Sequence, residues 1–131
     1  MIKMKRVIVL LQFVFLVCSV SAGPIHNAAK NGDLGGGKAE LDKGVDVNLE
    51  NVDGRLDPHR RTALHYAVRY DLIASLLINN GADIDKRDRD GHSPLSLAIW
   101  YIRLNVVDLL IKNGADLSFR IDEEIGYNDE L

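Results

Sequence analysis

A block of about 33 residues recurs three times along this chain of 131 residues. Each block closes on a glycine that a small or branched residue and an aspartate follow. The closing runs are Gly44-Val45-Asp46, Gly81-Ala82-Asp83 and Gly114-Ala115-Asp116, and the last two glycines are 33 residues apart. This period indicates a repeat architecture, in which each unit buries its apolar side only against its neighbours.

The residues within the blocks predict paired helices with defined ends. Thr62 and Ser93 are good N-cap residues, because a hydroxyl can accept a hydrogen bond from an unpaired helical N–H. Pro94 then occupies the first helical position, where its missing N–H costs nothing. The closing glycines follow the second helix of each block, where a left-handed C-cap favours glycine. The first helices carry alanines that let neighbouring units approach closely: Ala28, Ala67 and Ala98.

The runs Thr62-Ala63-Leu64-His65 and Ser93-Pro94-Leu95-Ser96, with the closing Gly-Ala-Asp runs, resemble the ankyrin repeat. The resemblance covers about residues 24–118, as repeats at about 24–54, 60–90 and 91–118. It implies an all-α solenoid of about three stacked helix–turn–helix repeats with β-turn fingers, and Leu64, Leu95 and Leu110 in one interior. It also implies that His26 and His65 are structural and hydrogen-bond between turns. Ser96 replaces this histidine in the third repeat, which argues against a shared metal site.

The first 22 residues have the order of a secretory signal. Three basic residues up to Arg6 precede an apolar stretch that ends at Cys18, and small residues lead to Ala22. We expect a signal peptide over 1–22, cleaved before Gly23, and an ankyrin-repeat domain over 23–131. The alternative is a retained anchor, but the apolar stretch of ~16 residues is short of the ~20 that span a bilayer.

This export signal predicts a secreted or periplasmic protein. The first repeat is similar to those of exported bacterial ankyrin proteins, which favours a bacterial source. The alternative location is the lumen of the endoplasmic reticulum in a eukaryote, because the last four residues, Asn-Asp-Glu-Leu at 128–131, are close to a retrieval signal. Cleavage would remove Cys18, the only cysteine, so no disulfide can form in the mature chain.

Two departures from the regular repeat affect the helices. The run Gly35-Gly36-Gly37 stands where the outer helix of the first repeat should begin, and each glycine costs ~1 kcal/mol relative to alanine. We therefore expect that helix to be short and to start near Lys38. Two residues are missing around Tyr70-Asp71-Leu72, so the turn inside the second repeat should be tightened.

Two further departures affect the surface. Residues 55–61 enlarge the first finger, which makes them either a partner-contact loop or a neutral insertion. The tail at 119–131 follows an apolar outer helix that no full repeat covers. Its Ile121, Ile125, Tyr127 and Leu131 suit a short apolar stripe that caps the third repeat. If the tail does not dock, the exposed end invites dimerisation or a partner.

Charge and missing motifs limit the possible functions. The whole chain carries −3, and the export segment holds three basic residues, so the mature charge is −3 − 3 = −6. An acidic domain repels phosphate backbones, which makes nucleic acid an improbable partner. We find no nucleophile motif, phosphate-binding loop or zinc motif, and therefore expect no enzyme activity, no cofactor and no metal.

The resemblance implies another protein as partner, bound by the finger tips and the exposed inner helices. Trp100 and Tyr101 are the leading candidates, because large aromatics dominate interface energies; the alternative is burial against the tail. The basic run 86–89 suits an acidic partner, unless it is only solvated. The full candidate set is Lys30, Asn31, Arg69, Tyr70, Lys86, Arg87, Arg89, His92, Trp100 and Tyr101.

We thus expect a non-catalytic protein–protein interaction module that is exported from the cytoplasm, with membrane contact only if the signal is retained. The alternative is a structural, self-assembling protein. It would form a homodimer through its uncapped C-terminal repeat.

Overall fold

Three antiparallel helix pairs make up the described part of the chain. The structure is a computed structural model that describes residues 23–52 and 58–118. The pairs are α2 (Pro24–Asn31) with α3 (Leu34–Asp42), α4 (Ala63–Tyr66) and its 3₁₀ extension η1 (Ala67–Arg69) with α5 (Asp71–Asn79), and α6 (Pro94–Trp100) with α7 (Leu104–Lys112).

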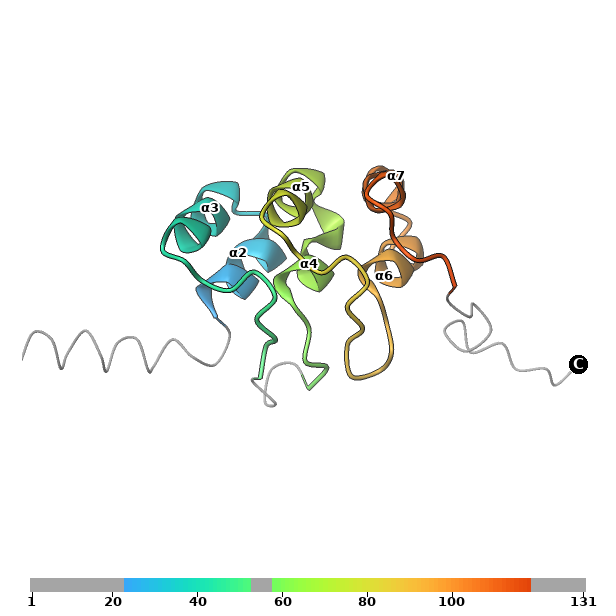
Figure 1. Ribbon diagram of the computed structural model, residues 1–131, viewed down its shortest axis with the longest axis horizontal. Coiled ribbons are helices and arrows are strands. Elements are labelled where there is room, and N and C mark those ends of the chain that lie inside the picture. The colour runs from blue at the N-terminus through green and yellow to red at the C-terminus, as the bar shows by residue number, and fades with distance from the viewer. Residues whose placement is uncertain (1–22, 53–57, 119–131) are drawn as a thin grey trace, which may run out of the picture.

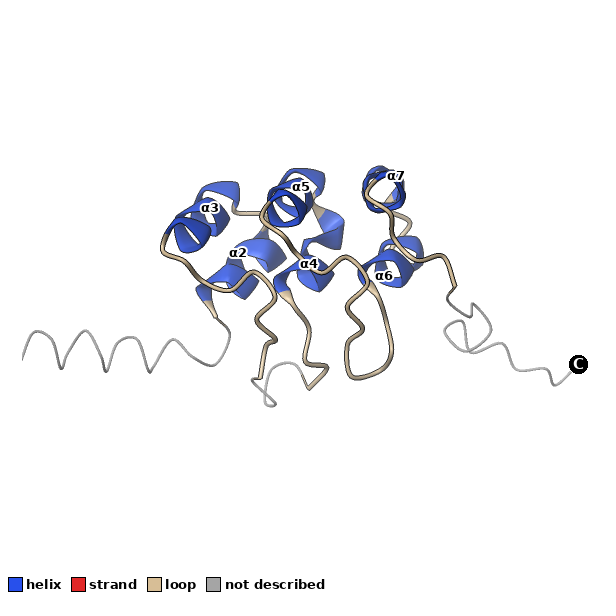
Figure 2. Cartoon of the chain, in the orientation of Figure 1, coloured by secondary structure: helices blue, strands red, loops and turns tan. Residues whose placement is uncertain are grey.

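The helices form two layers, with long loops on one side (Figures 1 and 2). The inner helices α2, α4 and α6 lie in one row, and the outer helices α3, α5 and α7 lie above them in a second row. The loops between the pairs project away from the outer row as fingers. Within the described ranges there is no strand, so the predicted all-α solenoid of three stacked repeats is confirmed.

One apolar interior runs through all three repeats. Leu64, Leu95 and Leu110 are at most 1% exposed and belong to the same buried cluster, as predicted. Ala67 and Ala98 have no exposed surface at all, which reflects close packing of the inner helices. Because each helix pair is too small to bury its own apolar face, this shared interior holds the stack together.

The helix ends follow the chemistry expected from the sequence. Ser93 Oγ accepts from the Ser96 backbone N–H at 3.2 Å, and Pro94 follows at the first helical position. After the outer helices, Gly44, Gly81 and Gly114 have φ values of 83°, 86° and 85°. These left-handed conformations strain any residue with a Cβ, so the repeated glycines terminate the helices.

The glycine run does not delay the outer helix of the first repeat, so that expectation was wrong. Helix α3 begins at Leu34 rather than near Lys38 and runs through all of 35–37. Asp33 supplies the start, because its Oδ1 accepts from the Gly36 backbone N–H at 2.9 Å. An N-cap of this kind stabilises a helix by ~0.5–2 kcal/mol, which offsets part of the glycine cost.

Packing against the second repeat adds a further reason. Gly37 is buried, and a Cβ built on it would lie 3.0 Å from Ile73 Cδ1 and 3.7 Å from Leu76 Cδ2. The missing side chain therefore lets α3 lie close to α5. Tertiary contact decides this helix where local propensity disfavours it.

The turn inside the second repeat is tightened, as the two missing residues predicted. The inner helix ends in the 3₁₀ turn η1, and only Tyr70, in an extended conformation with φ −134°, separates it from α5. The ring of Tyr70 covers the turn of the first repeat, where a Cβ on Gly32 would lie 2.7 Å from Tyr70 Cδ1. The shortened turn thus brings neighbouring repeats together.

The matching turn of the third repeat contains a strained residue. Gly32 ends the first inner helix with φ 70°, and Ile102 has φ 55° after the third. A β-branched residue in this left-handed region is a conformational outlier. Its side chain is 76% exposed, so little burial offsets the strain.

Several expectations concern residues outside the described ranges: the signal peptide at 1–22, part of the inserted loop 55–61, and the capping tail at 119–131. Among the described helices, none is long and apolar enough to cross a membrane.

Candidate functional site

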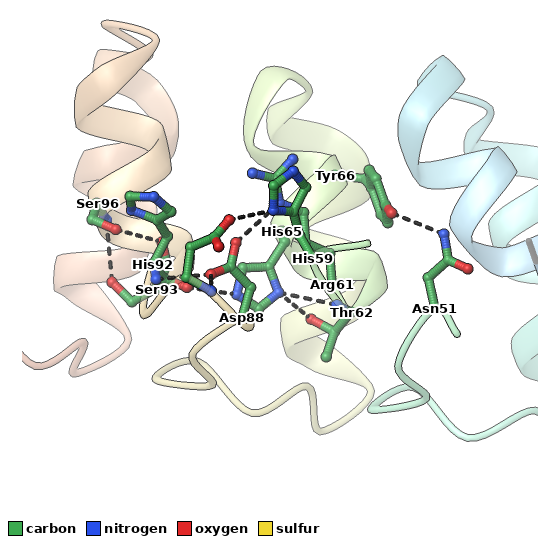
Figure 3. Close-up of polar contacts among 11 residues, drawn as sticks. Asn51, His59, Arg61, Thr62, His65, Tyr66, Asp88, His92, Ser93 and Ser96 are labelled. Atoms are coloured by element: carbon green, nitrogen blue, oxygen red, sulfur yellow. Dashed lines mark hydrogen bonds and ion pairs between the residues drawn. The ribbon is translucent and has the colours of Figure 1, made fainter. Parts of the chain in front are cut away.

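A buried histidine joins the second repeat to the next finger (Figure 3). His65 Nδ1 accepts from the Thr62 backbone N–H at 3.0 Å, and the Thr62 hydroxyl is 2.9 Å away. His65 Nε2 lies 3.0 Å from the His92 carbonyl oxygen, to which it donates. One nitrogen accepts and the other donates, so this ring is the neutral tautomer. Burial lowers the pKa of His65, which keeps it neutral.

In the first repeat, His26 likewise joins an inner helix to a finger, but it lacks the partner that Thr62 provides for His65. Its Nε2 donates to the Leu49 carbonyl oxygen at 2.7 Å, and burial lowers its pKa. Its Nδ1 is buried and has no hydrogen-bond partner in the described part of the chain. The residue at the Thr62 position is Gly23, which has no hydroxyl. The predicted structural role of both histidines is confirmed, because each ties an inner helix to a finger.

A buried carboxylate shapes the second finger (Figure 3). The Asp88 side chain is fully buried, and its Oδ2 lies 3.1 Å from Arg61 Nε. Its Oδ1 accepts from the backbone N–H groups of Asp90 at 3.0 Å and His92 at 2.9 Å. Such side-chain to backbone bonds fix a turn, and here they also tie it to the preceding finger. The second finger is therefore a preorganised surface.

An open cleft of about 450 Å³ lies between the two fingers. Its walls are Glu50 and Arg60 on the first finger and Arg87, Asp88 and Arg89 on the second; we call it the arginine cleft. The two walls are joined at the backbone, since the Arg89 N–H donates to the His59 carbonyl oxygen at 2.7 Å. The cleft is therefore held in shape by bonds between fingers.

Aromatic side chains lie at the C-terminal ends of the inner helices, away from the fingers. Trp100 is 56% exposed, Tyr101 37% and Tyr70 40%. The Arg69 guanidinium lies 4.5 Å from the centroid of the Tyr101 ring, a cation–π contact that positions both side chains. Lys30 and Asn31 are exposed at the end of α2. We call these six residues the helix-end group.

The predicted contact residues thus fall into two separate places. Lys86, Arg87, Arg89 and His92 lie on the second finger, before the start of α6. The helix-end group lies in the last turn of the inner helices or directly after it. An inner helix of 7–8 residues separates them, a distance of ~11 Å along its axis. A partner must span this length to touch both groups.

Sequence reasoning missed several surface residues. Glu50 and Arg60 form one wall of the arginine cleft, and pattern alone gives no signal for this, because the pairing depends on how the fingers stack. Ile102 and Leu104 are 76% and 72% exposed next to the helix-end group. They line a groove of about 280 Å³ that also includes Arg69. The signal for Ile102 was available, because the first repeat has glycine at this place.

The described residues contain no group of three or more His, Cys, Asp or Glu side chains placed to hold a metal ion. The predicted absence of a metal and of a cofactor remains a prediction. The two buried histidines are occupied by hydrogen bonds to the fingers.

Comparison with known proteins agrees with the stacked helix pairs. The family model described as ankyrin repeats (3 copies) matches residues 24–121. The chain belongs to the ankyrin-repeat family. The ankyrin repeat domain of human ASB11 is a similar solved structure, with a TM-score of 0.67 and 29% identity over 75% of this chain and 42% of that one.

Curated relatives are longer proteins that share the ankyrin region. Serine/threonine-protein kinase 12 of Arabidopsis thaliana is 36% identical over 66% of this chain, and the human transient receptor potential cation channel subfamily A member 1 is 31% identical over 82%. A putative ankyrin repeat protein of Rickettsia felis is 33% identical over 61%. The matches span only 18%, 12% and 37% of these relatives.

Ankyrin repeats generally mediate protein–protein interaction, and the fold is typically non-catalytic. What a large relative does as a whole protein does not transfer with a shared repeat region, because function belongs to sites rather than to a fold.

Proposed function

We propose that this chain is a non-catalytic module that binds another protein through its fingers and its helix-end group. The surface residues sit on a backbone that buried hydrogen bonds fix, as at His65 and Asp88. A preorganised surface loses little conformational entropy on binding, which favours affinity. The acidic net charge argues against nucleic acid as the partner.

The observation that carries this proposal is the exposed Trp100 beside Tyr101 and Arg69. Trp, Tyr and Arg are the side chains most enriched in interface hot spots. Here a 56% exposed tryptophan adjoins a tyrosine that an arginine already holds at 4.5 Å from its ring centroid. An apolar surface of this kind gains from being covered by a partner.

Site-specific photo-crosslinking tests the proposal. A photoreactive residue replaces Trp100 in one protein and Arg89 in a second, and the exposed Asp108 of outer helix α7 in a matched control. We expect one and the same protein to be captured from the native compartment at the first two positions and not at the control. Capture at the control position alone, or equal capture at all three, would contradict the assignment of the binding side.

We further propose that the protein is exported and acts in a secreted or periplasmic location, or in the endoplasmic reticulum lumen if its source is eukaryotic. Support comes from the basic, apolar and small-residue order of 1–22. The similarity to a Rickettsia felis protein is compatible with a bacterial source. N-terminal sequencing of the native protein tests this: Gly23 as first residue supports export, and an intact Met1 in the cytoplasm opposes it.

A homodimer is the second candidate. Leu104, Ile111 and Leu117 are 72%, 45% and 61% exposed on or after the last outer helix, where no further described repeat covers them. Stacking these ends together would bury apolar surface. Sedimentation equilibrium distinguishes the two candidates, since a monomer at high concentration excludes self-assembly and a stable dimer supports it.

A further inference from the structure

The two carboxylates that line the arginine cleft, Glu50 and Asp88, are already paired with cations of the fold. Glu50 pairs with Arg60 at 2.8 Å and with Lys86 at 3.1 Å, so two cations share one carboxylate. The hydrogen bond from Lys86 is the main cause of the lowered pKa of Glu50. Asp88 is buried and pairs with Arg61. Neither carboxylate has charge left to neutralise the remaining arginines.

Arg87 and Arg89 are the two cations of the cleft that form no ion pair with a described carboxylate. Both are exposed, and in the described ranges neither has a carboxylate within ion-pair distance. Arg87 Nη1 donates to the Gly91 carbonyl oxygen at 2.9 Å. A guanidinium presents several N–H donors in a plane that matches a carboxylate, so the cleft suits an acidic ligand.

The chain itself carries an acidic segment directly after the last described residue. Residues 119–131 contain one arginine against five Asp and Glu residues, a net charge of −4. They follow Ser118, and the chain just before that residue is fixed near the second finger. The Asp116 backbone N–H donates to Asp85 Oδ1 at 2.8 Å.

The positive charge of Arg87 already acts on Asp116, two residues before the end of the described chain. The pKa of Asp116 is lowered, chiefly because the Ser118 backbone N–H donates to its carboxylate, and Arg87 acts in the same direction. Thirteen further residues reach up to ~43 Å when extended, so length does not limit access to the cleft.

We propose that residues 119–131 occupy the arginine cleft and place their carboxylates on Arg87 and Arg89. A tethered ligand has an effective concentration in the millimolar range, which a separate acidic protein at cellular concentration does not match. The tail therefore fills the cleft in the free protein. If the proposed function holds, a partner that uses the fingers must displace the tail first, which makes the tail a competitor built into the chain.

Paramagnetic relaxation tests this in the chain from Gly23 to Leu131, which contains the whole described core and no native cysteine. A nitroxide on Asn128→Cys broadens amide signals near the tail. We expect at least a twofold loss of intensity for amides 87–91 at low salt. The loss should disappear in about 1 M salt, where the Debye length is ~3 Å.

Charge-matched variants make the test specific. Arg87→Gln with Arg89→Gln should abolish the broadening at the finger. Lys30→Gln with Lys38→Gln removes the same charge from exposed positions elsewhere and should leave the broadening unchanged. Dispersed amide spectra verify that each variant is folded, since all four side chains lie outside the buried core.

Three results would overturn the proposal. Broadening of amides 106–111 on α7 instead of 87–91 would mean that the tail caps the last repeat. In a second sample, an isotope-labelled chain without nitroxide is mixed with a chain that carries the nitroxide but no isotope label. Broadening of the isotope-labelled chain in that mixture would mean that the tail comes from a second copy. No broadening at any finger amide would mean that the cleft is open to an acidic partner. No binding partner is present in this experiment, so none of these results bears on the proposed protein binding. The crosslinking experiment tests that proposal separately.

Discussion

Replacing Ile102 by glycine should stabilise the protein, although it removes an isoleucine. Ile102 has φ 55° in the turn between α6 and α7. A residue with a Cβ in the left-handed region costs ~1–2 kcal/mol, and a branched Cβ lies at the upper end. Glycine removes this cost but adds ~0.5–1 kcal/mol of backbone entropy loss on folding.

The lost side-chain packing is small, because Ile102 is 76% exposed. Full burial of an isoleucine is worth ~1.5–3 kcal/mol, so a quarter of that, about 0.5 kcal/mol, is at stake. The balance predicts a gain of about 0.5–1 kcal/mol in the free energy of unfolding for Ile102→Gly. Urea denaturation followed by far-ultraviolet circular dichroism, with an unchanged m-value, measures it.

Two controls isolate the backbone as the cause. Ile102→Val keeps a branched Cβ in the same conformation and should bring no gain. Gly81→Ala makes the reverse change at φ 86°, where a Cβ meets nothing within 4 Å, and should lose about 0.5–1 kcal/mol. If Ile102→Gly lowers stability while Gly81→Ala is neutral, the strain argument is refuted.

Two further perturbations test the packing and the buried histidines. Gly35→Ala should raise the free energy of unfolding by ~0.5–1 kcal/mol, because the nearest atom to the added Cβ is 3.7 Å away. Gly37→Val should lower the free energy of unfolding by ~1–3 kcal/mol, because the added side chain meets Ile73. Equal effects of the two substitutions in denaturant titrations would contradict the close contact between α3 and α5. Burial holds the pKa of His65 and of His26 below 6.5, so the unfolded state binds protons more readily. The free energy of unfolding that depends on these neutral histidines is fully present above pH 6.5 and decreases as the pH falls from there to their lowered pKa values in the folded state. His65→Asn should therefore reduce the loss of stability between neutral and acidic pH, as measured by unfolding titrations at several pH values. An unchanged pH profile would exclude His65 as the source of that loss.

The sequence by itself determined the repeat, most of its helix ends and the residues of its interior. These features depend on short-range chemistry. Ser93 and Pro94 start a helix, Gly114 ends one, and Leu95 stands at the helical spacing of an apolar face. Exposed aromatics at the helix end were predictable for the same reason, since Trp100 follows the buried positions of its own helix.

Only the tertiary structure determined the conformation at positions where local preference and packing disagree. Gly37 is a poor helix former by itself, yet it lies in α3 because its missing side chain admits Ile73 from the next repeat. The arginine cleft is also beyond the reach of pattern. Its walls combine Glu50 and Arg60 with Arg87, and only the stacking of one repeat on the next brings these side chains together. Helix caps act over a few residues, whereas a surface between fingers depends on contacts between repeats, which no single repeat encodes.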